Sequence, residues 1–284
     1  MAHTLSSPGR GATRNTVAGV ITAKQYRHVA DLIADVTRAE ILPRFRALSD
    51  SDITHKRPGD LVTTADRLTE QRLSPLLEEF LPGSVAIGEE SVEHDRSLLR
   101  HTHTNAPVWI IDPVDGTSNF VAGSPDYSCL VTLSTKDEIH ASWIDAPSLG
   151  LTAGAHDGQA WINDETVRVT PPQSQRLDTV VTSHPNYAGT RSTVIDKLHA
   201  EGIATVPCNS AGLSYVDLLH GEYDALVYSW EKPWDHAAGL HLYTTAGGTA
   251  MTMTSEPFRV SGGNSLPFIV GTGPVVDRLH SILT

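Results

Sequence analysis

Residues 109–120 read Trp-Ile-Ile-Asp-Pro-Val-Asp-Gly-Thr-Ser-Asn-Phe, which places two carboxylates between an apolar run and a Gly-Thr step. The aromatic and β-branched residues at 108 to 111 favour a buried strand. Because Pro113 cannot donate a hydrogen bond to a neighbouring strand, we expect the strand to end at Asp112. Asp112 and Asp115 are then expected in the turn beyond the strand.

Two carboxylates held this close together repel each other unless a cation lies between them. Mg²⁺ prefers oxygen ligands and keeps some of its waters, so it suits such a pair. Gly116 allows close backbone approach, Thr117 adds a hydroxyl, and a helix beginning there would offer free N–H groups to a phosphate. The alternative is an Asx-turn in which Asp112 and Asp115 only cap a turn or a helix.

Two further acidic segments favour the metal-assisted phosphate site. Glu89 and Glu90 follow the apolar Val85-Ala86-Ile87, again at the end of a predicted strand. Asp235 opens an alanine-rich stretch and is expected near the start of a helix. Taken singly, Glu89 is compatible with a solvated loop charge and Asp235 with a helix N-cap.

In this combination the chain resembles the inositol monophosphatase family of Mg²⁺-dependent, lithium-sensitive phosphatases. The resemblance rests on five segments in a fixed order, from about residue 25 to the C-terminus. They are Asp60-Leu61-Val62-Thr63-Thr64-Ala65-Asp66 with Glu70, Gly88-Glu89-Glu90-Ser91, Trp109 to Phe120, Gly158-x-Ala160-x-x-Asn163, and Trp234-Asp235 with Ala237-Ala238-Gly239 and Ala246-Gly247-Gly248.

The resemblance implies two or three Mg²⁺ ions in one site. Glu89, Asp112 and the backbone carbonyl of Val114 are expected to hold the first ion. Asp112, Asp115 and Asp235 are expected to hold the second. A third, weaker site would use Glu89 with waters positioned by Asp66, while Glu90 would lie just outside the ligand set.

The expected mechanism is direct in-line attack of a metal-activated water on phosphorus, without a covalent phospho-enzyme. Thr117, backed by Glu89 or Asp66, is expected to orient that water. The resemblance further implies a set of phosphate- and substrate-binding residues: Asp115, Gly116, Thr117, Ser118, Gly212, Leu213, Ser214, Tyr228, Glu231 and Asp235. For Leu213 and Ser214 the alternative is ordinary helix capping by Ser210, and for Glu231 and Lys232 it is an exposed loop pair.

Two departures from the family pattern bear on the substrate. Tyr228 occupies the position of a glutamate that reads sugar hydroxyls in the inositol-specific enzymes, so inositol phosphate is in doubt as the substrate. His55 stands where the family usually has a lysine, with Lys56 one residue later. A shortened loop would bring Lys56 to the cleft.

Composition excludes several other functions. The net charge of −12 argues against nucleic acid and against an anionic membrane surface as partners. The two cysteines, Cys129 and Cys208, give no disulfide framework and suit a cytoplasmic location. No apolar run reaches the roughly 18 residues of a membrane-spanning helix, and no signal peptide is evident.

The expected fold is α+β to α/β, with the layered αβαβα arrangement that the resemblance implies. Helices are predicted over 22–48, broken at Pro43, and over 67–81, where Pro75 kinks the helix or makes it start late. Residues 1–18 are expected to be disordered, 19–170 to form an α+β metal-binding half with a large antiparallel sheet, and 171–284 to form an α/β half that completes the cleft. Pro171-Pro172 marks the predicted joint.

The sequence therefore predicts a Mg²⁺-dependent phosphomonoesterase that acts on a small polyol, sugar or amino-alcohol phosphate, and family analogy adds a homodimer. Alternatives within the class are phosphatases for histidinol phosphate, fructose 1,6-bisphosphate and 3'-phosphoadenosine 5'-phosphate. Outside it are a metal-dependent phosphodiesterase and a catalytically silent, metal-dependent binding protein.

Overall fold

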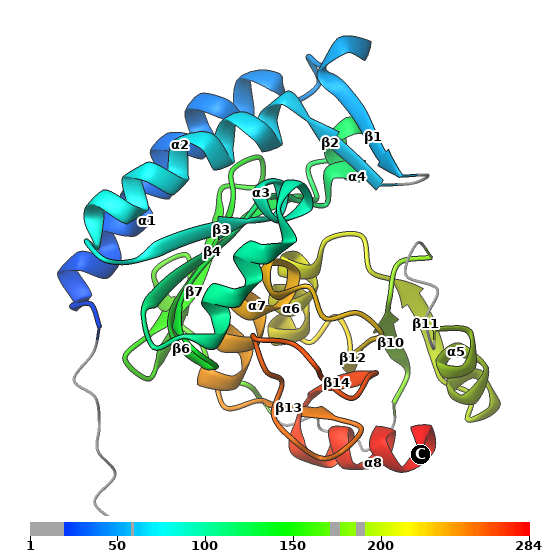
Figure 1. The fold of residues 1–284 in the computed structure, drawn as a ribbon. Helices are drawn as coiled ribbons and strands as arrows, with labels where there is room; N and C mark the ends of the chain where they lie inside the picture. Colours follow the sequence, from blue (N-terminus) through cyan, green and yellow to red (C-terminus); the bar gives the residue numbers. More distant parts are fainter. Residues whose placement is uncertain (1–19, 58–59, 171–176, 186–190) are drawn as a thin grey trace, which may run out of the picture.

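The protein is built from five alternating layers of helices and sheets (Figure 1). A computed structural model describes residues 20–57, 60–170, 177–185 and 191–284. Helices α1 and α2 form one outer layer, followed by a seven-stranded sheet, helices α6 and α7, a five-stranded sheet, and helices α5 and α8. The predicted αβαβα arrangement is confirmed. The N-terminal segment expected to be disordered lies outside the described residues.

The first layer pairs α1 (Ala23–Glu40) with α2 (Thr64–Phe80). Between them lie two 3-10 turns, Leu42–Arg44 and Asp50–Asp52, and a hairpin of β1 (Ile53–Arg57) and β2 (Asp60–Thr63). The helix predicted over 22–48 ends at Glu40, and Pro43 lies in the following 3-10 turn, so the break comes slightly before Pro43. The helix predicted over 67–81 is confirmed but begins earlier, at Thr64, because Thr63 and Asp66 form a capping box. Of the two alternatives for Pro75, the late start is wrong, since Pro75 lies inside the helix.

The large sheet has the strand order β3-β4-β5-β6-β7-β8-β9, with β3 parallel to β4 and all other pairs antiparallel. Short helical segments follow β3 and β4: α3 (Glu89–His94), a 3-10 helix (Arg96–His103) and α4 (Thr117–Val121). The strands are β3 (Val85–Gly88), β4 (Pro107–Asp115), β5 (Ser128–Thr135), β6 (Glu138–Ala146), β7 (Leu151–His156), β8 (Gln159–Ile162) and β9 (Glu165–Thr166).

Strand β4 continues past the point where the sequence predicted its end. Asp112 pairs with Leu130 and Asp115 with Ser128, so two residues of β4 stand opposite one residue of β5. The prediction that the strand ends at Asp112 is wrong. A β-bulge at Pro113-Val114 takes Pro113 out of the regular pairing, so its lack of an N–H group does not end the strand. Asp112 and Asp115 therefore belong to one strand, which fixes both more firmly than a turn would.

The small sheet has the order β11-β10-β12-β14-β13, with β11, β10 and β12 parallel and β14 antiparallel to its neighbours. Pro171 and Pro172, predicted as the joint, lie outside the described residues. The strands are β10 (Thr179–Thr182), β11 (Ala204–Pro207), β12 (Ala225–Tyr228), β13 (Thr249–Thr252) and β14 (Phe268–Gly271), and the helices are α5 (Arg191–Ala200), α6 (Ala211–His220), α7 (Pro233–Thr245) and α8 (Gly273–Leu283).

Separate apolar clusters fill the spaces between successive layers. Trp109 and Trp143 pack under α1 and α2, and Leu130 and Leu242 lie between the large sheet and α7. Tyr228 belongs to the cluster between α7 and the small sheet. Helix α7 is buried nearly all round because it lies in the middle layer. Within the described ranges, no helix combines the length and the apolar character needed to cross a membrane.

The close contact of α6 and α7 can be tested at Gly239. A methyl group added there would lie 2.0 Å from a ring carbon of Tyr215. We expect Gly239→Ala to lower the free energy of unfolding by about 1–3 kcal/mol, because the packed core must shift to admit the group. Urea unfolding of both proteins measures the change. Gly273→Ala, whose added methyl meets its nearest atom at 3.8 Å, is the control, and equal stability of the two variants would contradict this packing.

Candidate active site

A cleft of about 260 Å³ opens where β4, α3, α4, α6 and α7 converge. Helix starts and strand ends meet there, which gathers side chains from distant parts of the sequence. Eight of the predicted site residues line the cleft: Glu89, Asp112, Val114, Asp115, Gly116, Thr117, Ser118 and Asp235.

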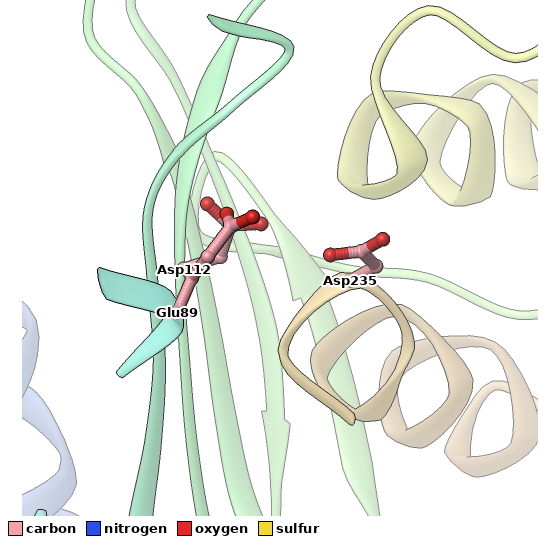
Figure 2. A group of neighbouring side chains, drawn as sticks. All are labelled: Glu89, Asp112 and Asp235. Carbon is pink, nitrogen blue, oxygen red and sulfur yellow. The ribbon is translucent and has the colours of Figure 1, made fainter. Parts of the chain in front are cut away.

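Three carboxylates face one another in this cleft (Figure 2). Glu89 comes from the start of α3, Asp112 from β4 and Asp235 from the first turn of α7, and each offers an oxygen within 4.8 Å of the other two. The N-cap of α7 is Lys232, so the alternative of Asp235 as a helix N-cap is wrong. The alternative of Glu89 as a solvated loop charge is also wrong, because its side chain is only 14% exposed.

Burial and neighbouring charges shift the pKa values of these carboxylates. Burial raises the pKa of Asp112 well above its usual range, and the charges of Glu89, Asp115 and Asp235 raise it further. Burial also raises the pKa of Asp235 to about 7, against the opposing effect of Lys232. Burial acts on Glu89 in the same direction, but Lys232 and Lys56 outweigh it and leave the pKa of Glu89 lowered. Without a bound cation, the cluster therefore favours the protonated forms of Asp112 and Asp235.

The oxygen atoms of this cluster fit a metal ion. Among the described residues, Asp112 Oδ1 is buried and has no hydrogen-bond partner, which is costly for a carboxylate. Glu89 and Asp235 each offer a carboxylate oxygen within 4.8 Å of one on Asp112, and hard divalent cations take such ligands. The arrangement therefore suits Mg²⁺ or a similar ion.

Asp115 is engaged differently from the other three acids. Its Oδ2 accepts hydrogen bonds from Ser210 Oγ at 2.6 Å and from the Gly212 N–H at 2.8 Å, and its Oδ1 accepts one from the Ala211 N–H at 2.9 Å. These donors form the start of α6. Asp115 thus joins the large sheet to α6 as well as lining the cleft, and its replacement would disturb both.

Thr117 is the first residue of α4 and lies beside Asp66, another buried acid. Its hydroxyl lies 2.9 Å from the Val114 carbonyl and 3.3 Å from Asp66 Oδ1. Burial raises the pKa of Asp66 to about 6. Of the two carboxylates predicted to back Thr117, the structure brings Asp66 within hydrogen-bond reach. The left-handed Gly116 (φ 86°) turns the chain into α4, whose first intrahelical bonds come from the Asn119 and Phe120 N–H groups.

Two lysine side chains lie next to the acidic residues, and a β-bulge determines the position of one of them, Lys56. His55 pairs with Leu61 and Arg57 with Asp60, so Lys56 is the extra residue of β1. The bulge leaves His55 exposed and brings Lys56 Nζ to 2.6 Å from Glu90 Oε1 and 3.5 Å from Glu89 Oε1. Lys56 thus contacts Glu89, which lines the cleft, but Lys56 is not itself among the residues that line it. Lys232 Nζ lies 3.1 Å from Glu89 Oε1.

The other predicted substrate residues lie away from the metal cluster. Leu213 and Ser214 border a separate hollow with Leu149 and Tyr223. Ser210 Oγ accepts a hydrogen bond from the Leu213 N–H, so the capping alternative describes this helix start. Gly212 meets the cleft only through its N–H bond to Asp115.

Two more predicted substrate residues, Tyr228 and Glu231, do not line the cleft. The Tyr228 side chain is fully buried among aromatic rings and is not part of the cleft lining. Glu231 accepts hydrogen bonds from the Asn264 backbone and side chain at 2.7 and 2.9 Å. Neither side chain faces the acids in this structure.

Other side chains complete the cleft walls without having been predicted. Arg57, Asp60, His184 and Asn209 line it, and Trp230 donates from Nε1 to Asp235 Oδ2 at 2.5 Å. The position of Arg57 follows from the Lys56 bulge, which no residue pattern revealed. Trp230 was detectable only as an aromatic residue shortly before Trp-Asp.

Comparison with known proteins shows similarity of sequence and fold over most of the chain. The model of the "Inositol monophosphatase family" matches residues 23–274. A Thermotoga maritima protein named fructose-1,6-bisphosphatase/inositol-1-monophosphatase is 28% identical over 82% of this chain and 86% of its own. An inositol-1-monophosphatase of Rhizobium meliloti is 30% identical over 72% of this chain and 76% of its own. The solved Thermotoga maritima IMPase has a TM-score of 0.72 at 24% identity, covering 92% of this chain and 94% of its own.

The raised carboxylate pKa values predict how stability depends on pH in EDTA. Asp66, Glu90 and Asp235 have pKa values of about 6, 7 and 7 in the folded protein, chiefly through burial, against about 4 when unfolded. The folded state therefore binds more protons between about pH 4 and 7, and these groups lower stability as pH rises through that window. Urea unfolding at pH 5 and 7.5 tests this. Buried His236 and His241, whose pKa values burial lowers to about 3 and 4, act in the opposite direction, so the decisive comparison is between the wild type and Asp235→Asn. The wild type should lose more stability, or gain less, than Asp235→Asn as pH rises from 5 to 7.5, and the same pH dependence in both proteins would contradict this assignment.

Proposed function

We propose that this protein hydrolyses a small phosphate ester with Mg²⁺ held by its acidic cluster. The chain belongs to the inositol monophosphatase family and is therefore a phosphoric monoester hydrolase. The observation that carries the proposal is the buried, unpaired Asp112 oxygen within reach of Glu89 and Asp235. A cation would satisfy that oxygen and relieve the repulsion among the three carboxylates.

The proposed metal ligands are those predicted from the sequence: Glu89, Asp112, the Val114 carbonyl, Asp115 and Asp235. Bound Mg²⁺ would supply charge neutralisation, a more acidic water and polarisation of the phosphate. Because Asp115 oxygens already accept bonds from the start of α6, one of those contacts would have to be shared or exchanged. Two or three ions per site remain the expectation.

The chain's own residues would position the reacting groups. Thr117 Oγ lies 2.9 Å from the Val114 carbonyl and 3.3 Å from Asp66 Oδ1, so its one proton can go to either oxygen while a lone pair accepts a hydrogen bond from the attacking water and orients it. The pKa of Asp66, raised by burial to about 6, suits a carboxylate that takes up a proton near neutral pH. The Gly116 and Thr117 N–H groups at the start of α4 are proposed to bind the phosphate.

A small polyol, sugar or amino-alcohol phosphate is the substrate class that we propose. The volume of about 260 Å³ suits a compact ester. With Tyr228 buried, the cleft has no tyrosine hydroxyl at the position where a glutamate reads sugar hydroxyls. Discrimination among polyols would then depend on other lining groups, such as Asp60, Asn209 and Ser118.

A bisphosphate is the second candidate. Arg57 and Lys232 line the cleft, where they pair with Glu93 and Glu89, and their positive charges could also attract a second anionic group. The relative from Thermotoga maritima carries fructose-1,6-bisphosphatase in its name. Lithium sensitivity, a homodimer and a cytoplasmic location are further expectations by family analogy and cysteine use.

The test is release of inorganic phosphate from inositol 1-phosphate, histidinol phosphate, fructose 1,6-bisphosphate and 3'-phosphoadenosine 5'-phosphate, with Mg²⁺ or with EDTA. We expect Mg²⁺-dependent release from at least one ester. Asp112→Asn should lower that rate by about 100-fold or more, the scale on which loss of one preorganised charge-stabilising group acts.

Asp145→Asn is the matched control. Asp145 lies on β6, is 7% exposed like Asp235, and accepts a hydrogen bond from Thr37 at 2.5 Å. This variant should keep most of the activity, because Asp145 does not line the cleft. Equal release in EDTA would refute the metal requirement. Metal binding without any phosphate release would favour the silent binding protein.

A further inference from the structure

Two ammonium groups converge on one oxygen of Glu89. Lys232 Nζ lies 3.1 Å and Lys56 Nζ 3.5 Å from Glu89 Oε1. The lysines come from separate elements: Lys56 lies on β1, and Lys232 is the N-cap residue of α7. This is the same carboxylate that meets Asp112 and Asp235 within 4.8 Å. Positive charge therefore already stands at the edge of the acidic cluster.

The two lysines differ in how firmly they are held. The Lys56 side chain is 8% exposed and has a second, shorter contact with Glu90, at 2.6 Å. The Lys232 side chain is 30% exposed, and its ammonium also lies 5.5 Å from the centre of the Trp234 ring. Lys56 keeps an anionic partner if Glu89 is taken by another cation. Besides Glu89, Lys232 contacts the aromatic face of Trp234, which attracts an ammonium group more weakly than a carboxylate does.

A divalent ion bound to Glu89 would stand a few ångströms from the Lys232 ammonium. Like charges at such a distance repel strongly in a partly buried site. Both cations also compete for the lone pairs of the same carboxylate. The metal cannot bind at full strength while Lys232 keeps its present contact.

We infer that Lys232 is a built-in counter-ion that stabilises the acidic cluster before the metal binds, is displaced from Glu89 when the metal arrives, and thereby limits metal affinity. The inference rests on the proposed metal site. Lys232 acts through Glu89 and is a positioning residue. Its place three residues before Asp235 couples its movement to the turn that carries a proposed ligand.

The test is isothermal titration of the full-length, metal-free protein with Mn²⁺ and with Mg²⁺ at pH 8, in the absence of substrate. Lys232→Met should bind metal about tenfold more tightly than the wild type, because it removes the competing charge at a partly exposed site. The same variant in EDTA should have a thermal midpoint lower by about 2–4 °C, because the acids lose a counter-ion. A merely structural role would lower stability without tightening metal binding.

Three further variants distinguish an effect of the Lys232 charge from a loss of folding or a general effect of removing a lysine. Lys232→Arg should restore both properties toward the wild type, and Lys232→Gln repeats the test if the methionine variant folds poorly. Lys197→Met, which removes a lysine bound to the Leu283 carbonyl at 2.7 Å, should leave metal affinity unchanged. Unchanged or weaker metal binding in Lys232→Met would overturn the inference. Absence of metal binding in the wild type would overturn the proposed function instead.

Discussion

Mutual repulsion among buried carboxylates is the constraint on which the site depends. Glu89, Asp112 and Asp235 are drawn together by three separate elements, and the desolvation of each raises the cost of its charge. A fold that places them so close is stable only if cations or protons compensate. Lys56 and Lys232 supply part of that compensation, and the unpaired Asp112 oxygen marks where more positive charge is needed.

The same kind of group also joins the layers. Asp66 closes the capping box of α2, and Asp115 receives the first N–H groups of α6. Glu70 accepts hydrogen bonds from the Glu90 and Ser91 N–H groups in the first turn of α3. Carboxylates at helix starts are stabilised by the helix dipole. These contacts hold the cleft walls in place, so scaffold and candidate chemistry share residues.

The sequence predicted the layered fold and most of the acidic cluster, because their residues lie in short patterns at strand ends and helix starts. It did not predict the two bulges. One carries β4 past Pro113, and the other turns Lys56 toward Glu89, since pairing register depends on the partner strand. The inward orientation of Tyr228 was also missed, because its burial follows from packing against α7 in the third dimension. Substrate contacts are therefore less predictable than metal ligands.

The central claim, that the three carboxylates form a cation site, is tested most directly by anomalous diffraction from crystals grown with Mn²⁺. We expect a strong anomalous peak bounded by Glu89, Asp112 and Asp235, with the Lys232 ammonium moved away from Glu89. A cleft without such a peak, with Lys232 still paired to Glu89, would contradict it.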